Sequence, residues 1–492
     1  MSDTRNVYVD VGAARIQQYI GRTPRLKGQR GASAWLSWAT SEEQVTGFLR
    51  DDPELAALGV EVNRAAGQAD GLISVRIPEV PASPEQEGRE QEAARAVAVA
   101  LVGYLRPLLP SLEIHGLWGV GPGYLQVYRH QMKPSRDNPP LVSLPPQAGF
   151  PALESCAECR ADPVAGEVRI HDGAFRVCLD CLARYGDRHR RPGLGAEPPR
   201  LPVYREEAAL ARALGRDPVK GTAEDFEALA ALGGAETWRN HIATVYIDGN
   251  AIGPLFDRIA EHGDPDIKER ASAAVSAATR RSLLDATRTV AGEDPRELLP
   301  VIPHVVGGDD LLVSVVADRA WRFTVAYLEA FRAYARDIPG AVDAPDTAPP
   351  SASAGLVFAH AKFPFRRAAE LAAERLRAAK KEFHGASPAV AWLDVTRDGE
   401  QAPGFLRAWE LDGLLALADA LSALRTQVEP SGRAALERLV DTNQPVVSLA
   451  RVREHARRLD RDAVIEPFLS DQDAGTGIER MAAALSAARW WR

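Results

Sequence analysis

The expected secondary-structure elements follow the same order twice along this chain, and this repeat constrains the fold more than any other feature. In residues 1–132, a short apolar strand, a helical stretch, two strands around a turn, a long amphipathic helix and further strands follow one another. Residues 241–400 show the same order, starting with the apolar run at 243–247. The order βαββαβ is typical of the ferredoxin-like arrangement, in which two helices cover one face of an antiparallel sheet. The sequence therefore predicts an α+β protein with two ferredoxin-like (βαββαβ) units.

Proline-rich stretches separate these two units from the rest of the chain. Residues 133–151 and 191–202 are rich in proline and are expected to be linkers. They enclose a cysteine-containing module at about 153–190, which lies between the two units. Residues 200–240 are expected to form a helical brace for the second unit. Residues 401–492 are expected to form a C-terminal helical domain, because only helical periodicity continues there.

Charge and hydropathy exclude several classes of protein. The chain has 492 residues, enough for about three domains. Its 59 Lys and Arg against 67 Asp and Glu give a formal net charge of −8, which is not expected of a protein that binds nucleic acid over its whole surface. The longest apolar run, Ala96–Leu105, is too short to cross a bilayer, and the N-terminus lacks the apolar segment of a signal peptide. We therefore expect a cytoplasmic protein with no membrane partner.

All four cysteines of the chain lie within 26 positions, which indicates a metal site in a reducing compartment. They form two CxxC pairs, Cys156 with Cys159 and Cys178 with Cys181. Two such pairs at this separation can hold Zn²⁺ through four thiolates, and a site with no open position is structural. The zinc would replace the apolar core that so short a module cannot build. The alternative is four buried free cysteines.

Two adjacent carboxylates are expected at the tip of a hairpin in the second unit. Apolar strands flank the run Gly307, Gly308, Asp309 and Asp310. Glycines permit a tight turn and let a bulky ligand approach the backbone. Neighbouring carboxylates repel each other, and a divalent cation relieves that repulsion. The hairpin is therefore a candidate metal site.

A third carboxylate is expected beside this hairpin. The first strand of the second unit ends in Asp248, and a loop of small residues, Gly249–Gly253, then enters a helix. In a βαββαβ sheet the first strand lies next to the hairpin, so we expect Asp248 near Asp309. Acids from adjacent strands can hold two Mg²⁺ ions, and the loop offers N–H groups to a triphosphate. This layout suits attack of a 3′-hydroxyl on an α-phosphate. The alternative is two turns that only reverse the chain.

With these motifs the sequence resembles the large, signature subunit of type III CRISPR effector complexes, a family of palm-domain cyclic-oligoadenylate synthases. The resemblance covers essentially the whole chain. It rests mainly on four segments, VYVDVGAARIQQYIGRTPRLKGQRGASAWL at 7–36, YIDGNAIG at 246–253, VGGDDLLVSVVADRA at 306–320 and HAKFPFRRAAELAAERLRAAKK at 360–381. It implies that the two units are palm domains, with a four-cysteine zinc ribbon between them and a helical tail.

The resemblance implies an enzyme whose second palm links ATP molecules 3′–5′ into cyclic oligoadenylates, second messengers of antiviral defence. In that family the reaction usually starts when target RNA pairs with the guide RNA of the complex. The implied partners are therefore ATP, target RNA and the guide RNA–protein subunits, and the implied catalytic metal is Mg²⁺ or Mn²⁺, two ions per site. The implied residues are the metal ligands Asp248, Asp309 and Asp310, the nucleotide contacts Gly249, Asn250, Gly253, Gly307 and Gly308, and a cation among Lys362, Lys380 and Lys381.

The first palm departs from this pattern. Its strand keeps Asp10, but the turn at Ala66–Gly71 carries Asp70 alone where the second palm has two acids. Two-metal binding is therefore not expected there, and we interpret the first palm as a structural partner that shapes the nucleotide site. Many family members carry an HD nuclease domain. Here the chain starts at the first palm and its His171–Asp172 pair lies in the cysteine module, so no DNA nuclease activity is expected.

Other functions stay open on the sequence alone. The chain could be a stand-alone palm nucleotide cyclase of a non-CRISPR defence system, or a catalytically silent scaffold subunit, although the intact acids argue against a scaffold. A basic cluster in the first palm is expected either to contact guide-RNA phosphates or a neighbouring subunit, or to be a solvated loop. This cluster consists of Arg22, Arg25, Lys27 and Arg30.

Overall fold

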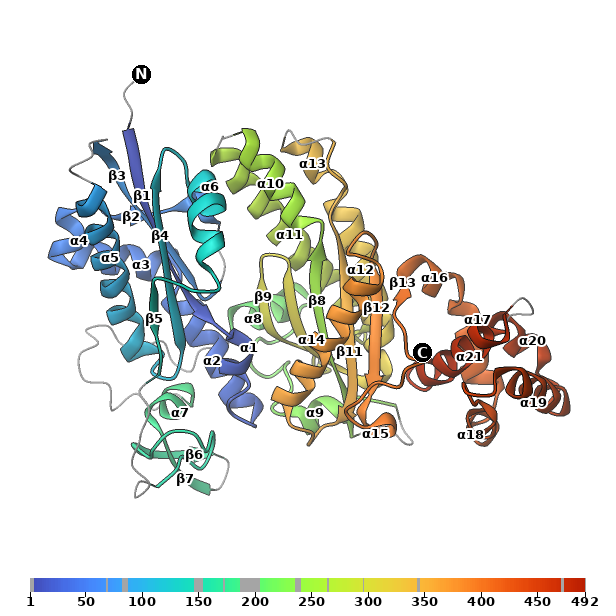
Figure 1. Ribbon diagram of the computed structural model, residues 1–492. Coiled ribbons are helices and arrows are strands. Elements are labelled where there is room, and N and C mark those ends of the chain that lie inside the picture. Colours follow the sequence, from blue (N-terminus) through green and yellow to red (C-terminus); the bar gives the residue numbers. More distant parts are fainter. Residues whose placement is uncertain are drawn as a thin grey trace.

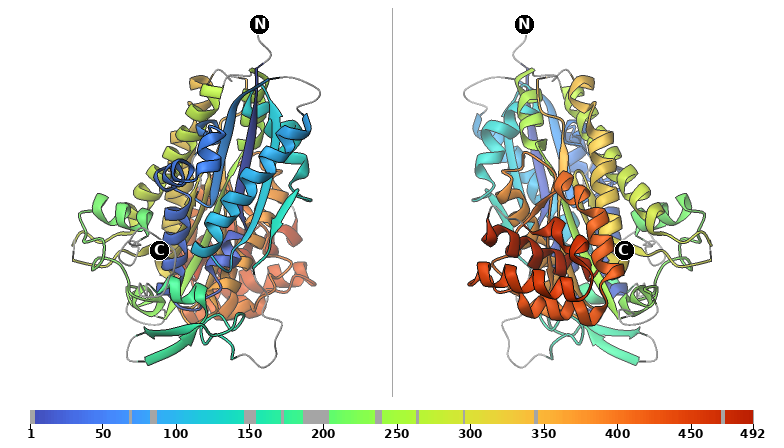
Figure 2. Two further views of the ribbon diagram at one scale, coloured as in Figure 1. Left: turned by 90° about the vertical axis from the view of Figure 1, so that its left-hand side faces the viewer. Right: turned by 90° about the vertical axis from the view of Figure 1, so that its right-hand side faces the viewer.

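The computed structural model places two β-sheets side by side, with a small cysteine module beneath the first and a helical bundle beyond the second (Figure 1). Figure 2 shows the molecule from its two ends, with the first sheet toward the viewer on the left and the C-terminal helices toward the viewer on the right. The structure describes residues 4–67, 70–81, 87–145, 154–170, 173–185, 204–234, 240–262, 265–294, 296–342, 346–469 and 473–491. Within these ranges, no helix is both long and apolar enough to cross a lipid bilayer. The His171–Asp172 pair lies outside them.

The first sheet has the strand order β2-β3-β1-β4-β5, and β1 to β4 form the predicted ferredoxin-like arrangement. Central β1 pairs antiparallel with β3 and β4, and its apolar residues are buried beneath the covering helices. The strands are β1 (Thr4–Ala14), β2 (Glu61–Val62), β3 (Leu72–Pro81), β4 (Glu113–Gly121) and β5 (Leu141–Ser143). The helices are α1 (Ile16–Ile20), α2 (Leu26–Ala39), α3 (Glu42–Asp51), α4 (Pro53–Ala57) and α5 (Glu87–Leu108).

Two element boundaries in the first palm differ from the sequence prediction. The helical stretch expected over 32–50 is two helices, because Ser41 caps α3 by accepting a hydrogen bond from a backbone N–H in its first turn. The strands expected over 112–129 end with β4, and α6 (Tyr124–Val127) follows. The first and last residues of α6 are buried together, which is a helical spacing and not the alternation of a strand.

The second sheet has the order β13-β12-β11-β8-β10-β9, in which β8 to β11 repeat the ferredoxin-like arrangement. Helix α14 packs closely on this sheet, since a Cβ on Gly355 of β11 would lie 2.1 Å from the Ala372 carbonyl oxygen. The strands are β8 (His241–Asn250), β9 (Val301–Gly307), β10 (Asp310–Val316), β11 (Ser351–His360), β12 (Ala389–Asp394) and β13 (Trp409–Glu410). The helices are α10 (Ile252–His262), α11 (Pro265–Val290), α12 (Ala320–Ala335), α13 (Ile338–Ala341), α14 (Phe365–Glu382) and α15 (Val395–Asp398).

The predicted helical C-terminal region is confirmed, and the chain end returns to the second sheet. Trp490 stacks on Phe358 of β11, with ring centroids 5.1 Å apart, and its indole N–H donates to Asp394 at 2.8 Å. The C-terminal helices are α16 (Leu411–Ala416), α17 (Ala418–Gln427), α18 (Pro430–Leu439), α19 (Pro445–Arg458), α20 (Asp462–Ile465) and α21 (Ala474–Ala488). Before the second sheet lie α8 (Arg205–Ala213) and α9 (Phe226–Ala230).

The cysteine module docks on the first palm through ion pairs that use the basic cluster. Arg22 pairs with Asp162 at 2.8 Å, Arg25 pairs with Glu158, and Arg30 pairs with an acid of α8. The interpretation of these three arginines as a solvated loop is therefore wrong, because each of them forms an ion pair with an acid of a distant segment. The module consists of β6 (Gly166–Ile170), β7 (Gly173–Val177) and α7 (Leu179–Arg184).

Candidate functional site

Three acids meet at one end of the second sheet, where β8 ends and the β9–β10 turn lies. The register of β10 against β8, continued by one residue, places Asp310 opposite Asp248. Asp309 lies in the turn and packs against the backbone of β8, since a Cβ on Gly249 would lie 2.7 Å from its Oδ2 atom. The structure thus brings together the three acids that the sequence singled out.

The turn that carries Asp309 has the geometry that two glycines permit. Gly307 pairs with Asp310 and closes the hairpin, and Gly308 has a φ of +58°, a conformation that favours glycine. A Cβ on Gly308 would meet no atom within 4 Å, so the tip borders open space. The Thr279 hydroxyl of α11 donates to the Gly308 carbonyl oxygen at 2.8 Å and holds the tip against this helix.

Of the three candidate lysines, the structure brings Lys380 to the acids. Its Nζ atom donates to the Asp248 carboxylate and, at 2.7 Å, to the Gly249 carbonyl oxygen. Lys362 instead pairs with an acid of α9 at 3.0 Å, with 74% of its side chain exposed. Lys381 is exposed near the end of α14. Only Lys380 is therefore placed to neutralise charge at the acids.

The junction between β8 and α10 is held by the side chain of Asn250. Its amide nitrogen donates to two serine hydroxyls of β11, at 3.1 and 2.9 Å, and the residue is buried. The next residue, Ala251, has a φ of +60°, which is strained for a residue with a Cβ. Gly253 follows in the first turn of α10, where a Cβ would meet open space. The Asn250 side chain thus binds β11 and is not available for a contact with a ligand.

The acids carry more negative charge than the neighbouring lysine neutralises. Burial and the nearby Asp248 raise the pKa of Asp310 to about 9, and the same two causes raise the pKa of Asp309. Lys380 opposes both shifts. A divalent cation favours ionised carboxylates, so this donor set fits Mg²⁺ or Mn²⁺.

The raised pKa of Asp310 predicts how the stability of the metal-free protein depends on pH. A carboxyl group whose pKa is higher in the folded than in the unfolded chain contributes stability in full below its unfolded value of about 3.9. This contribution is lost as the pH rises toward about 9. Without added divalent cation, the wild-type chain is expected to unfold at a lower temperature near pH 9 than near pH 6, and Asp310→Asn should reduce this difference. An unchanged difference in thermal unfolding would contradict the assigned shift.

Two side chains at the site were missed by the sequence analysis. Tyr246 lies two residues before Asp248, and burial together with the nearby acids raises its pKa. Gln17 of α1 opposes this shift. The repeat of VYVD at 7–10 as VYID at 245–248 could have drawn attention to this tyrosine. Thr279 carries no such pattern, because α11 is separated from the turn by a loop and a strand.

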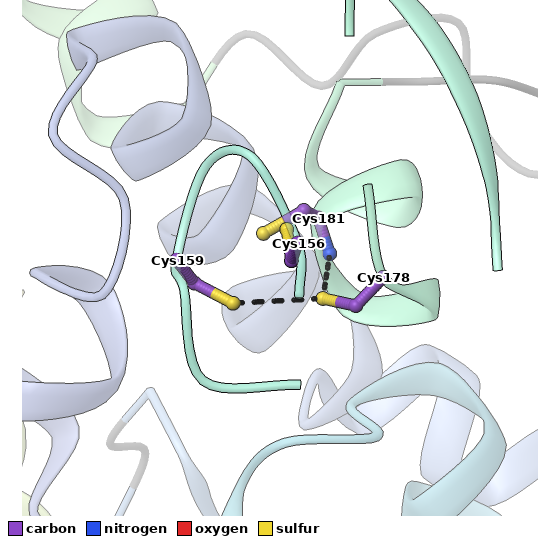
Figure 3. A group of neighbouring side chains, drawn as sticks. All are labelled: Cys156, Cys159, Cys178 and Cys181. Atoms are coloured by element: carbon purple, nitrogen blue, oxygen red, sulfur yellow. Dashed lines mark hydrogen bonds between the residues drawn. The ribbon is translucent and has the colours of Figure 1, made fainter. Parts of the chain in front are cut away.

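The four cysteines converge within the cysteine module (Figure 3). Their Sγ atoms all lie within 4.8 Å of one another, and no other set of three or more ligand residues in the described part of the chain is as compact. The Sγ atoms of Cys159 and Cys178 are 3.7 Å apart. A tetrahedral zinc site with Zn–S bonds of about 2.3 Å separates its sulfurs by ~3.8 Å. None of the four forms a disulfide, and the donor set fits Zn²⁺.

The second palm matches a known family. Residues 241–386 match the model described as Cas10/Cmr2, second palm domain. This palm is Cas10-like. No curated protein matches the sequence of the chain.

Solved structures share the fold of nearly the whole chain. The apo Csm1–Csm4 cassette matches with a TM-score of 0.57 and 18% identity, covering 97% of this chain and 70% of that one. Csm1 in T. onnurineus matches with a TM-score of 0.55 and 17% identity, covering 97% and 70%. A Csm1–Csm4 cassette in complex with cA4 matches with a TM-score of 0.54 and 16% identity, covering 98% and 70%. At such identities the likeness establishes the fold.

Proposed function

We propose that this Cas10-like chain is a nucleotidyltransferase that converts ATP into cyclic oligoadenylates for antiviral defence. We further propose that it is the large subunit of a type III CRISPR complex, with guide RNA–protein subunits and target RNA as partners. The observation that carries the proposal is the Asp309–Asp310 turn beside Asp248 in the matched second palm. Structures with the same fold are complexes with cA4, cA3, AMPPNP and one ATP, which supports a nucleotide site in this fold.

In the proposed reaction, the 3′-hydroxyl of one adenylate loses its proton to solvent and its oxygen forms a bond to the α-phosphorus of another ATP. The bond between that phosphorus and the pyrophosphate leaving group breaks. Two Mg²⁺ or Mn²⁺ ions, when bound, would stabilise the entering and leaving oxygens. The ionised carboxylates of Asp248, Asp309 and Asp310 would hold these metal ions. Gly307 and Gly308 would let the nucleotide approach the turn, because neither carries a side chain.

The remaining contacts to the triphosphate would come from the β8–α10 junction and from Lys380. The backbone N–H groups of Gly249, Asn250 and Gly253 are candidate phosphate donors at the start of a helix. Lys380 bonds to Asp248 in the metal-free protein. Because a divalent cation would neutralise Asp248, its binding would free the ammonium of Lys380 for a phosphate oxygen.

The test is mass spectrometry of the products formed from ATP with Mg²⁺ or Mn²⁺, by the chain alone and by the chain with its complex subunits and target RNA. Asp309→Ala/Asp310→Ala is the matched control. Oligoadenylates that require the RNA-loaded complex and disappear in the control would support the full proposal. Product from the isolated chain, unaffected by RNA, would indicate a stand-alone cyclase. Absence of product in every arm would contradict the proposed activity and favour a scaffold.

The choice of Lys380 over the other lysines can be tested by substitution. Lys380→Met is expected to lower kcat/KM for ATP by roughly 10–100-fold, because charge-assisted hydrogen bonds are worth roughly 1.5–3 kcal/mol. Lys362→Met and Lys381→Met are matched controls on exposed cations and should stay within about twofold of the wild type. Initial rates of pyrophosphate release measure the effect. An equal loss in Lys381→Met would contradict the assignment of Lys380.

A further inference from the structure

The first palm repeats the acid-bearing strand of the second palm but surrounds its acid differently. VYVD at 7–10 in β1 corresponds to VYID at 245–248 in β8, and both strands lie at the centre of their sheets. Opposite Asp10, at the place that Asp310 takes in the second palm, β3 carries Ser74. Asp10 is 4% exposed, whereas the side chain of Asp248 is 32% exposed. Only the acid of the second palm is open to a ligand from solvent.

Both carboxylate oxygens of Asp10 accept hydrogen bonds within the first palm. The Ser74 hydroxyl donates to Oδ1 at 2.5 Å, and the Tyr124 hydroxyl donates to Oδ2 at 2.7 Å. Burial raises the pKa of Asp10, while these hydrogen bonds and the positive charges of Lys268 and Arg136 lower it. Lys268 belongs to α11, a helix of the second palm. A cation of the second palm therefore stabilises the ionised form of a buried acid in the first palm.

Lys268 is inserted into the first palm and is 8% exposed. Its Nζ atom lies 4.2 Å from the centroid of the Tyr124 ring and donates to the Ala66 carbonyl oxygen at 3.4 Å. Burial lowers the pKa of Lys268 to about 8, and the charge of Asp10 opposes this shift. An ammonium over the face of a tyrosine, whose hydroxyl in turn binds a carboxylate, is stabilised by the ring and by the acid.

One face of α11 runs from this buried group to the acid turn of the second palm. Ser272, one helical turn after Lys268, packs against the first palm so closely that a Cβ on Gly67 would lie 2.1 Å from its Oγ atom. Thr279, two turns further along, donates to the carbonyl oxygen of Gly308. Spacings of four and seven residues keep these three side chains on one face of the helix.

We infer that the buried group of Asp10, Tyr124 and Lys268 fixes α11 against the first palm and thereby positions the Gly307–Asp310 turn. Lys268 is a positioning residue for the acids of the second palm, and this inference rests on the proposed function. In the first palm, the ammonium of Lys268 stabilises the ionised form of Asp10. In the second palm, a divalent cation is proposed to stabilise the ionised acids. The retained acid of the first palm is thus used to join the two palms and not to bind metal.

Hydrogen–deuterium exchange and steady-state kinetics on the full chain, under the conditions that give product, test this inference. Lys268→Met is expected to speed amide exchange in residues 64–67 and 306–312 and to lower kcat on the order of 10–100-fold. Arg288→Met is the matched control, because Arg288 is an exposed cation of the same helix and pairs with Asp285, three residues before it. It should change neither quantity.

Two further variants separate positioning from general loss of folding. Thr279→Val keeps the buried group but removes the bond to the turn, so it should speed exchange in 306–312 alone and also lower kcat. Asp10→Asn combined with Lys268→Met removes both buried charges and should unfold at a higher temperature than Lys268→Met alone, while kcat stays low.

The outcomes distinguish this inference from the proposed function. A wild-type chain without product in any arm would contradict the proposed function, while the exchange data would still test the link between Lys268 and the turn. A productive wild type in which Lys268→Met changes neither turn exchange nor kcat would overturn the inference. If Lys268→Met fails to fold, the inference is tested with Thr279→Val and with the double variant Asp10→Asn/Lys268→Met. A normal kcat in both of these variants would overturn the inference.

Discussion

Asp310→Asn is expected to lower oligoadenylate formation on the order of 10³-fold while leaving the metal-free chain at least as stable as the wild type. The pKa of Asp310 is raised to about 9 in the metal-free protein, so the side chain is protonated near neutral pH. Asparagine resembles this neutral form in shape and polarity. It cannot supply the negative charge that a hard divalent cation requires. The variant should therefore lose metal binding and keep its fold.

Thermal unfolding with and without Mg²⁺, combined with mass spectrometry of products, measures both parts of this prediction. Mg²⁺ should raise the unfolding temperature of the wild type, because a ligand that binds only the folded state stabilises it, and should leave that of Asp310→Asn unchanged. Asp412→Asn, at an exposed acid of α16, is the matched control and should behave as the wild type. Retained product in Asp310→Asn, or a marked loss of metal-free stability, would show that this acid has a different role.

The second large effect is expected from Cys178→Ser. This variant should abolish zinc binding and unfold the cysteine module. A structural zinc contributes roughly 10–16 kcal/mol to the folding of zinc-finger peptides near neutral pH. The module's own core is small, since its buried cluster contains few apolar side chains besides the cysteines. These are Val168, Val177, Leu182 and Tyr185, with Phe175 packed against them.

Loss of the zinc site should also release the module from the first palm. Arg22 donates to the Cys159 sulfur at 3.8 Å as well as to Asp162, so the cluster and the docking contacts share one cation. The first sheet should stay folded, because its own core is formed by its strands and helices. Measured zinc content and limited proteolysis test this. Arg169→Ser, at an exposed position of β6, is the control. Full zinc content and an uncut module in Cys178→Ser would disprove a four-thiolate site.

The two sheets and the acid turn could be predicted because they depend on patterns that are local in the sequence. Apolar strands separated by a two-glycine turn form a hairpin wherever their apolar face is buried. The antiparallel order of a βαββαβ unit then places the end of β8 beside that turn. The ends of individual helices and strands were less predictable. Tyr124 begins a helix where a strand was expected, and its hydroxyl binds Asp10, which is far away in the sequence.

The sequence by itself determined the α+β architecture, the four-cysteine site and the acids of the second palm, because spacing and periodicity specify each of them. Only the tertiary structure decided which charges meet. It selected Lys380 from three lysines by laying α14 across β8, and it directed Arg22 and Arg25 to acids of the cysteine module. It also buried Lys268 of one palm beside the acid of the other. Long charged side chains have no preferred partner in a local pattern, and their pairing follows from which surfaces the folded chain brings together.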